Sequence, residues 1–280
     1  MRYARRWQKV VFFVALSAAA FVSLYPLLWM VGASFLAERE IFDHVGLIPR
    51  SVSLDNYVSG WRGVGGVTFT TYFVNTLILV VLRIAGTLLS CSMAAYAFAR
   101  LDFTGKRVLF PLVLLTMMLP FHVTVVPQYV MFFRMGWVGS IKPLVVPAVL
   151  ASGSFFIVLM VQFMRGLPVE LDQAALVDGC SVFDIYWRII LPLSAPALVT
   201  AAIFVFIWTW NDFFSQLLYL TRPGDFTVAL GLRGFMDASA GSAYGQLFAM
   251  SIVSLIPVVG FFVAFQRLLI EDISTTGWKG

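Results

Sequence analysis

Few side chains in this 280-residue chain are arranged to do chemistry. The two histidines, His44 and His122, stand far apart, with no cysteine or carboxylate at ligand spacing, so no metal site is predicted. No nucleophile, base and orienting acid form a recognisable set, which indicates that the chain is not an enzyme. Its one Gly-Lys pair, Gly105-Lys106, is followed by Arg107, whereas a phosphate-binding loop ends in Gly-Lys-Ser or Gly-Lys-Thr. The chain therefore carries no nucleotide-binding motif of this kind.

Among the polar residues inside the long apolar runs, Arg83, Asn211 and Asp212 stand out. Such residues are costly at membrane depth, so each is expected to face the interior of a helix bundle or a water-filled cavity. Asn211 and Asp212 could line the route of a solute. Alternatively, Asp212 lies near the outer end of its span and caps it, or pairs with Arg83 or with a neighbouring chain.

The composition is that of a membrane protein. Hydrophobic residues make up 60% of the chain and charged residues only 12%, which is too apolar for a soluble protein of this length. A bilayer admits helices or closed barrels, and a helix needs about 20 apolar residues to cross about 30 Å of hydrocarbon. The apolar runs here are continuous and longer than the strands of about ten residues that build a barrel. They predict an all-α membrane protein.

About six membrane spans are expected. They lie near residues 10–36, 72–99, 108–131, 144–164, 195–220 and 246–268. The first run follows several basic residues, as a signal peptide does, but its apolar character continues from Phe21 to Phe35, which favours a membrane span. No internal repeat or linker divides the chain, so residues 1–280 are predicted to form a single transmembrane domain.

Charge predicts the topology. With both termini in the cytoplasm, 11 Lys and Arg residues lie inside and 7 outside, and Arg83 is left within a span. The sequence therefore favours a multi-pass protein of the cell (inner or plasma) membrane with cytoplasmic N- and C-termini.

The basic residues are scattered and not gathered in a stripe, so no nucleic-acid partner is expected. Cys91 and Cys180 are expected to be small packing residues and not a disulfide.

The loop over residues 165–194, between the fourth and fifth spans, contains the residues that typically begin and end two short helices. Pro168 suits a first helical position, and Gly179 suits the left-handed residue that ends a helix. Ser181 and Asp184 form a variant of the capping box that would start a second helix, and Pro192 stands where this helix must kink or stop. The pattern alone fits equally well an interfacial hairpin that merely links two spans.

The residue spacing of this loop is similar to that of a known family motif. The loop resembles the signature loop of membrane subunits in binding-protein-dependent ATP-binding-cassette (ABC) importers, which reads Glu-Ala-Ala, three residues, Gly, nine residues, Ile, any residue, Leu, Pro. The matching residues are Gln173, Ala174, Ala175, Gly179, Ile189, Leu191 and Pro192. Every interval agrees, and Gln173 in place of Glu is the departure. A match spread over twenty positions is far more specific than a lone short motif.

The resemblance implies a type I ABC importer permease with a cytoplasmic coupling helix that docks into a groove on a separate ATPase subunit. The residues implied in this coupling are Gln173, Ala174, Ala175, Asp178, Gly179, Ile189, Leu191 and Pro192. ATP and Mg²⁺ would be bound by the partner ATPase, and this chain would hold no cofactor. Gln173 offers neutral hydrogen bonds where the family has a carboxylate, and Asp172 or Glu170 could take over that charge.

Other segments extend the resemblance over most of the chain, toward the second permease of carbohydrate importers of the maltose-uptake type. Leu119-Pro120-Phe121 resembles the proline-broken start of the family's central helices, and the stretch from Trp208 to Phe213 resembles its aromatic-Trp-Asn-Asp segment. Gln266-Arg267 and the terminal Lys279-Gly280 resemble the family's tail, which reaches toward the ATPases.

A sugar-like solute would find its contacts in the fifth span. Asn211, Asp212 and Trp210 are the candidates for the solute path, since Asn211 and Asp212 could hydrogen-bond sugar hydroxyls. Trp208 and Trp210 could stack on a sugar ring, but tryptophan near a membrane interface more often acts as an anchor. Both alternatives remain open for the two tryptophans.

The sequence thus predicts a pore-forming permease subunit of an ATP-driven importer for a carbohydrate-like solute. Its expected partners are a second related permease, two ATPase subunits, an external solute-binding protein and membrane lipid. The alternative is a secondary transporter driven by an ion gradient, which would need paired broken helices and membrane carboxylates, and Asp212 is the one hint of these. A membrane enzyme or scaffold would leave the loop unexplained.

Overall fold

The computed structural model describes residues 6–43, 46–236 and 243–276, and side chains within 7–43, 46–236 and 243–265. His44, Lys279 and Gly280 lie outside the described residues, as do the side chains of Gln266 and Arg267. Within the described part, the regular secondary structure is helical apart from one isolated bridge between Val64 and Val67. The predicted all-α class is confirmed.

The helices differ widely in length. The long ones are α1 (Arg6–Ala33), α3 (Phe69–Arg100), α4 (Lys106–Met118), α5 (Phe121–Arg134), α7 (Ser154–Arg165), α11 (Ala195–Asn211) and α14 (Tyr244–Thr276). The short ones are α2 (Asp55–Trp61), α6 (Lys142–Val149), α8 (Glu170–Val177), α9 (Val182–Ile185), α10 (Leu191–Leu193), α12 (Phe214–Tyr219) and α13 (Val228–Gly234). A π-helical turn, Tyr186–Ile190, joins α9 to α10.

Six segments match the expected spans. Trp7–Ala33, Phe69–Arg100, Lys142–Arg165 and Tyr244–Phe265 are each long and apolar enough to cross a membrane. Two further candidates are bent pairs, α4 with α5 and Val182–Leu193 with α11, which bend by 103° and 73°. The chain is thus a multi-pass membrane protein.

The third span, expected over residues 108–131, is broken at Leu119-Pro120, as the resemblance to proline-broken central helices implied. The chain turns sharply between α4 and α5, because Pro120 has no N–H to donate and disfavours a helical Leu119, whose backbone is extended at φ −75° and ψ 119°. The fifth span also ends earlier than expected, at Asn211, since Asp212 is extended at φ −72° and ψ 95°.

Side chains complete the hydrogen bonding where helices are interrupted. Between α6 and α7, the Ser90 hydroxyl accepts from the Ala151 N–H at 3.2 Å and donates to the Ala148 carbonyl at 2.8 Å. Beyond α11, the Gln216 side chain donates to the Thr209 carbonyl at 2.9 Å. Unpaired backbone groups are costly in hydrocarbon, so these polar side chains allow the breaks.

The contacts divide the chain into two compact units. One comprises residues up to 69 and 231–256. In it the Glu38 carboxylate accepts hydrogen bonds from the backbone N–H groups of Tyr244 and Gly245, at 2.8 and 2.9 Å. A negative charge suits the N-terminus of α14, where the helix dipole is positive.

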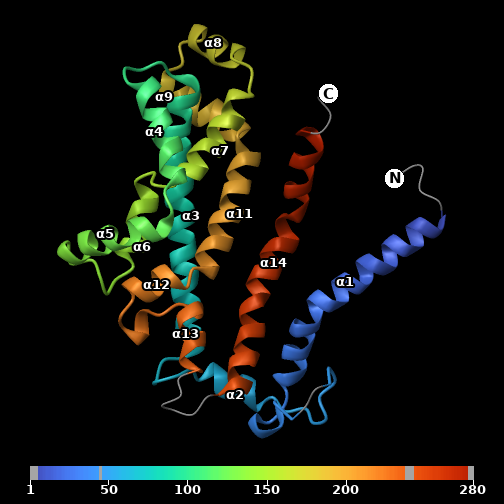
Figure 1. Ribbon diagram of the computed structural model, residues 1–280. Helices are drawn as coiled ribbons and strands as arrows, with labels where there is room; N and C mark the ends of the chain where they lie inside the picture. Colours follow the sequence, from blue (N-terminus) through green and yellow to red (C-terminus); the bar gives the residue numbers. More distant parts are fainter. Residues whose placement is uncertain (1–5, 44–45, 237–242, 277–280) are drawn as a thin grey trace. The chain divides into compact units, whose positions relative to one another are not determined.

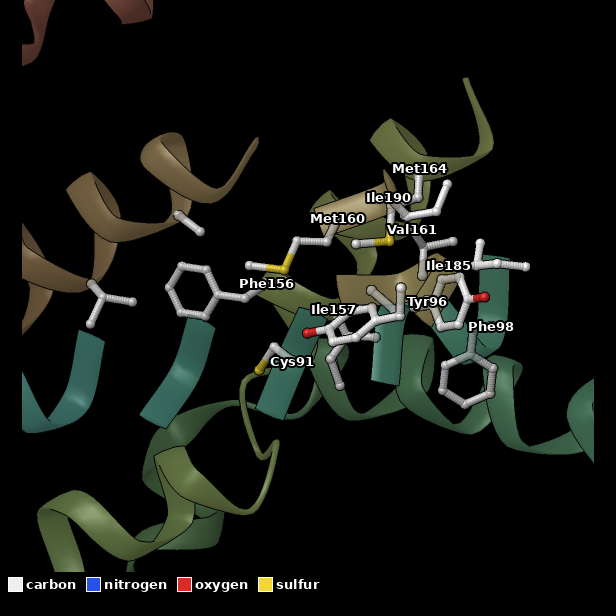
Figure 2. Packing of buried hydrophobic residues seen from close by; sticks show 14 of the residues in the cluster. Cys91, Tyr96, Phe98, Phe156, Ile157, Met160, Val161, Met164, Ile185 and Ile190 are labelled. Carbon is white, nitrogen blue, oxygen red and sulfur yellow. The ribbon is translucent and has the colours of Figure 1, made fainter. Parts of the chain in front are cut away.

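The second unit, residues 70–230 and 257–280, contains the largest buried cluster. Helices α4 and α11 both pack against α7 (Figure 1). Side chains of α7, among them Phe156, Met160 and Met164, interleave with those of α3, of α9 and of the π-helical turn (Figure 2). Cys91 is one of the buried residues, as expected for a packing role.

The close packing of α3 on the residues before α7 can be tested at Gly86. A Cβ atom there would lie 2.8 Å from the Val149 side chain and 3.2 Å from its backbone nitrogen. We expect Gly86→Ala to destabilise the fold by about 1 kcal/mol, since overpacking outweighs the gain in helix propensity. Gly260→Ala is the matched control, because no atom lies within 4 Å of its Cβ position.

Thermal unfolding of the purified protein in detergent would compare the two variants. The expected result is a lower Tm for Gly86→Ala and an unchanged or higher Tm for Gly260→Ala. An equal response of both variants would contradict the close approach at Gly86.

Candidate functional site

The loop after α7 folds as the predicted pair of short helices. Gly179 ends α8 with φ +83°, the left-handed conformation that favours glycine. The Ser181 hydroxyl accepts from the Asp184 N–H and the Asp184 carboxylate accepts from the Ser181 N–H, both at 3.2 Å, so the capping box is present. The Ser181 hydroxyl also donates a hydrogen bond to the Asp184 carboxylate, and this bond, together with the one from the Ser181 N–H, holds the pKa of Asp184 below its ordinary value. The carboxylate that starts α9 is therefore ionised at neutral pH.

An ion pair fixes α8 to the end of α3. The Arg100 guanidinium lies 3.1 Å from the Asp172 carboxylate and also donates to the Leu167 carbonyl at 2.8 Å. Only 6% of the Arg100 side chain is exposed, so this pair is largely shielded from solvent. Asp172 was one of two candidates to replace the family's glutamate toward a partner, but it is turned toward its own chain. Of the two, Glu170 is the exposed carboxylate.

Two tyrosines hold the second half of the loop. The Tyr96 hydroxyl donates to the Val182 carbonyl at 3.1 Å, and the Tyr186 hydroxyl lies 2.7 Å from that of Ser92. The two rings also pack together, with centroids 5.3 Å apart. These anchors and Arg100 were missed at the level of sequence. Arg100 stood at the end of a span like any topogenic charge, and a tyrosine within an apolar run gave no signal.

The motif residues divide between two faces. Ala175 is 5% exposed and packs into the cluster of α3 and α7, while Ile189 and Leu191 are half-buried against the same cluster. The outward face carries the exposed residues Gln173, Ala174, Leu176, Val177, Asp178, Gly179 and Pro192. The expectation that Ala174 and Ala175 both approach a partner is therefore corrected for Ala175, whose small side chain lets α8 lie close to its own bundle.

A second polar site lies at the break after α11. The Arg83 guanidinium of α3 is 3.5 Å from the Asp212 carboxylate, whose other oxygen accepts from the Ser215 N–H at 3.0 Å. Asp212 thus pairs with Arg83, as one of the alternatives required, and caps α12, the helix that follows it. Arg83, Asp212 and Ser215 line a cavity of about 630 Å³ and also a second one of about 590 Å³.

The structure separates the three candidates for the solute path. Asn211 and Asp212 line the 590 Å³ cavity, and the Asn211 amide also donates to the Ile207 carbonyl at 2.8 Å. Trp210 is 5% exposed and stacks on Phe206, with centroids 5.5 Å apart, so its ring is not open to a sugar. The interpretation of Trp210 as a path residue is corrected, and Trp208, which is exposed, lines that cavity instead.

Comparison with known proteins decides the family. Residues 86–274 match the model of the binding-protein-dependent transport system inner membrane component, which is more than half of the chain and includes the α8–α9 loop and Asp212. The chain belongs to this family. The predicted family and function as an importer permease are confirmed, and the gradient-driven alternative is not supported.

Relatives of this permease match along nearly its whole length. A permease protein of Caldicellulosiruptor sp. (strain Rt8B.4) is 32% identical, covering 100% of this chain and 99% of the relative. The arabinooligosaccharides transport permease of Halalkalibacterium halodurans is 33% identical over 93% of each chain. The trehalose/maltose transport permease of Thermococcus litoralis is 31% identical over 98% of each chain.

A solved structure shares the fold of this permease. One chain of a bacterial ABC transporter that imports the acidic polysaccharide alginate superposes with a TM-score of 0.84, at 21% identity, covering 95% of this chain and 98% of that chain. The predicted permease architecture is confirmed by this likeness.

The Arg100–Asp172 pair of the permease gives a stability prediction. Asp172→Asn should destabilise the protein by about 2 kcal/mol, because the buried Arg100 guanidinium loses its charged partner. Its hydrogen bond to the Leu167 carbonyl remains and limits the loss. Asp102→Asn is the control. It removes a fully exposed carboxylate 3.4 Å from Lys106 and should cost less than about 0.5 kcal/mol. Unfolding by SDS titration in mixed micelles measures both changes, and equal values would contradict the anchoring role of the pair.

Proposed function

We propose that this permease forms half of the translocation pathway of an ATP-driven importer and passes a carbohydrate delivered by an external binding protein. The observation that carries the proposal is the α8–α9 loop, which is held to the bundle on one face and exposes the motif residues on the other. A loop that merely linked two spans would need neither the buried ion pair nor the residue spacing of the family's docking motif.

The outward face of this loop fits a protein partner. Val177 is 88% exposed and Phe183 is 60% exposed, although both are apolar and lie in a polar loop. Such exposed apolar side chains mark interaction surfaces. The occupant that the family motif implies is an ATPase subunit, one for each of two permeases, and these ATPases would bind ATP and Mg²⁺.

The anchors of the loop offer a route for coupling. A shift of α8 would be passed to the end of α3 by Arg100 and Asp172, and a shift of α9 by Tyr96 and the Val182 carbonyl. Helix α3 runs without a proline from Phe69 to Arg100 and carries Arg83 near its middle. Movement of the ATPases would therefore reach the membrane cavities through one continuous helix.

A carbohydrate cargo is supported by the relatives and by the cavities. Two of the similar permeases are named for oligosaccharide or disaccharide uptake. The cavity at Arg83 offers an amide, hydroxyls and charged groups beside aromatic side chains, including Gln128, Ser215 and Trp137. Hydroxyl-rich solutes suit this mixture, since each hydroxyl both donates and accepts hydrogen bonds.

The docking proposal is tested by Gly179→Asp. At φ +83° an aspartate costs about 1 to 3 kcal/mol in strain and adds charge to the exposed face, so recovery of the cassette ATPase with the purified permease should fall several-fold. Gly66→Asp is the matched control, because Gly66 has φ +81° and, like Gly179, no atom within 4 Å of its Cβ position. It should leave recovery unchanged.

Co-purification from the native membrane in mild detergent gives the result, with monodisperse elution of each variant as the check on folding. Recovery of the permease alone, together with solute uptake that does not depend on ATP, would refute the importer. Equal losses from the two variants would refute docking through α8.

We also propose that the α8–α9 loop and both termini are cytoplasmic. In a Cys180→Ser background, Val177→Cys should react with a membrane-impermeant maleimide only after permeabilisation, whereas Val52→Cys should react in intact cells. Both positions are well exposed, at 88% and 73%, and Cys91 is buried. Reaction of Val177→Cys in intact cells would reverse the proposed orientation.

A further inference from the structure

The Arg83–Asp212 pair is the charged centre of a site that meets α3 near the middle of that helix. Arg83 lies about 21 Å along α3 from Phe69 and about 26 Å from Arg100, at a rise of about 1.5 Å per residue. The two cavities of about 630 and 590 Å³ share Arg83, Asp212 and two neighbours, Phe121 and Ser215. A solute that occupied either cavity would therefore meet this pair.

The opposite charges of Arg83 and Asp212 leave the site close to neutral. Among the described residues that line the larger cavity, Arg83 and Asp212 are the ones with formal charge at neutral pH, and their side chains are 27% and 18% exposed. Opposite charges 3.5 Å apart leave little net charge for an ionic ligand. The site therefore presents strong hydrogen-bond donors and acceptors but little net charge.

Unused hydrogen-bonding groups accompany the pair. Arg83 Nε and the Tyr219 hydroxyl are buried oxygen and nitrogen atoms without a hydrogen-bond partner in the described structure, and both residues line the larger cavity. Buried polar groups are normally satisfied, and these two atoms have almost no accessible surface, so a ligand would pair with them only after the lining has moved to expose them. Phe121 and Trp137 add aromatic surface to the same lining.

We propose that this centre binds saccharides and that Asp212 makes it select neutral sugars over acidic ones, an inference that rests on the proposed carbohydrate import. The hydroxyls of a neutral sugar can donate to Asp212 and accept from Arg83 at once. The carboxylate of a uronic acid gains from Arg83 but is repelled by Asp212, and it also loses its hydration on entry. Asp212 is thus the specificity-determining residue.

Asp212→Asn separates the charge of this residue from its structural role. An asparagine oxygen can still accept from the Ser215 N–H, so α12 keeps its cap. The carboxylate charge is lost, and Arg83 becomes free to bind an acidic group. Asp102→Asn changes the net charge of the protein by the same amount, at an exposed residue that lines neither cavity.

The full chain in neutral phospholipid nanodiscs would be titrated with α-1,4-linked galactotriose and with trigalacturonate, which has the same linkage and differs only in its C6 groups. Saturation-transfer NMR gives the Kd of each sugar at neutral pH and low salt. The wild type and Asp102→Asn should bind galactotriose more tightly. Asp212→Asn should shift the ratio of the two Kd values by about tenfold toward trigalacturonate, and adding Arg83→Gln should cancel that shift.

An unchanged ratio in Asp212→Asn, or an equal shift in Asp102→Asn, would overturn the proposal. Absence of binding of either sugar to the wild type, while the assembled importer still takes up oligosaccharides with ATP, would overturn it and leave the proposed function intact. Uptake of a cargo other than a carbohydrate by that importer would overturn the proposed function itself.

Discussion

An unpaired peptide N–H or carbonyl costs several kcal/mol in hydrocarbon, and this constraint governs where the helices of this permease can be interrupted. Each break needs polar side chains to replace the missing backbone partners. Ser90 serves the break between α6 and α7, while Gln216 and Asp212 serve the one between α11 and α12. Of these three residues, Asp212 also lines both membrane cavities, so the proposed solute site lies beside a place where the helical hydrogen bonding is incomplete.

Helix α3 connects the two sites. It meets the membrane cavities through Arg83 and the loop through Arg100, and each arginine is paired with an aspartate from another element of the chain. About 26 Å of continuous helix separates the two arginines. Buried pairs of this kind contribute little net stability, because desolvation offsets attraction, but they penalise any arrangement that separates the charges. The two pairs therefore fix the register of α3 against the loop and against the broken fifth span.

Sequence predicted those features that depend on local chemistry. Long apolar runs located the four segments long enough to cross a membrane and the two bent helix pairs. Gly179 located the end of α8, the Ser181–Asp184 box located the start of α9, and motif spacing indicated the family. The predictions that were wrong depended on the direction in which a side chain points. Trp210 lies in a helix that is apolar on all sides, so no periodicity distinguished its buried face from the cavity face. Ala175 and Asp172 likewise gave no local sign that they turn inward, since their partners lie far away in sequence.

The exposed apolar face of the α8–α9 loop has a consequence for biogenesis. Val177 and Phe183 are 88% and 60% exposed in this chain, and the loop that carries them is anchored by Arg100 and Tyr96. A copy of the permease without its proposed partner would leave this apolar surface uncovered, and chaperones, proteases and other copies of the permease could then bind it. Cellular amounts of the subunit are thus expected to follow the supply of its partner, with surplus chains degraded.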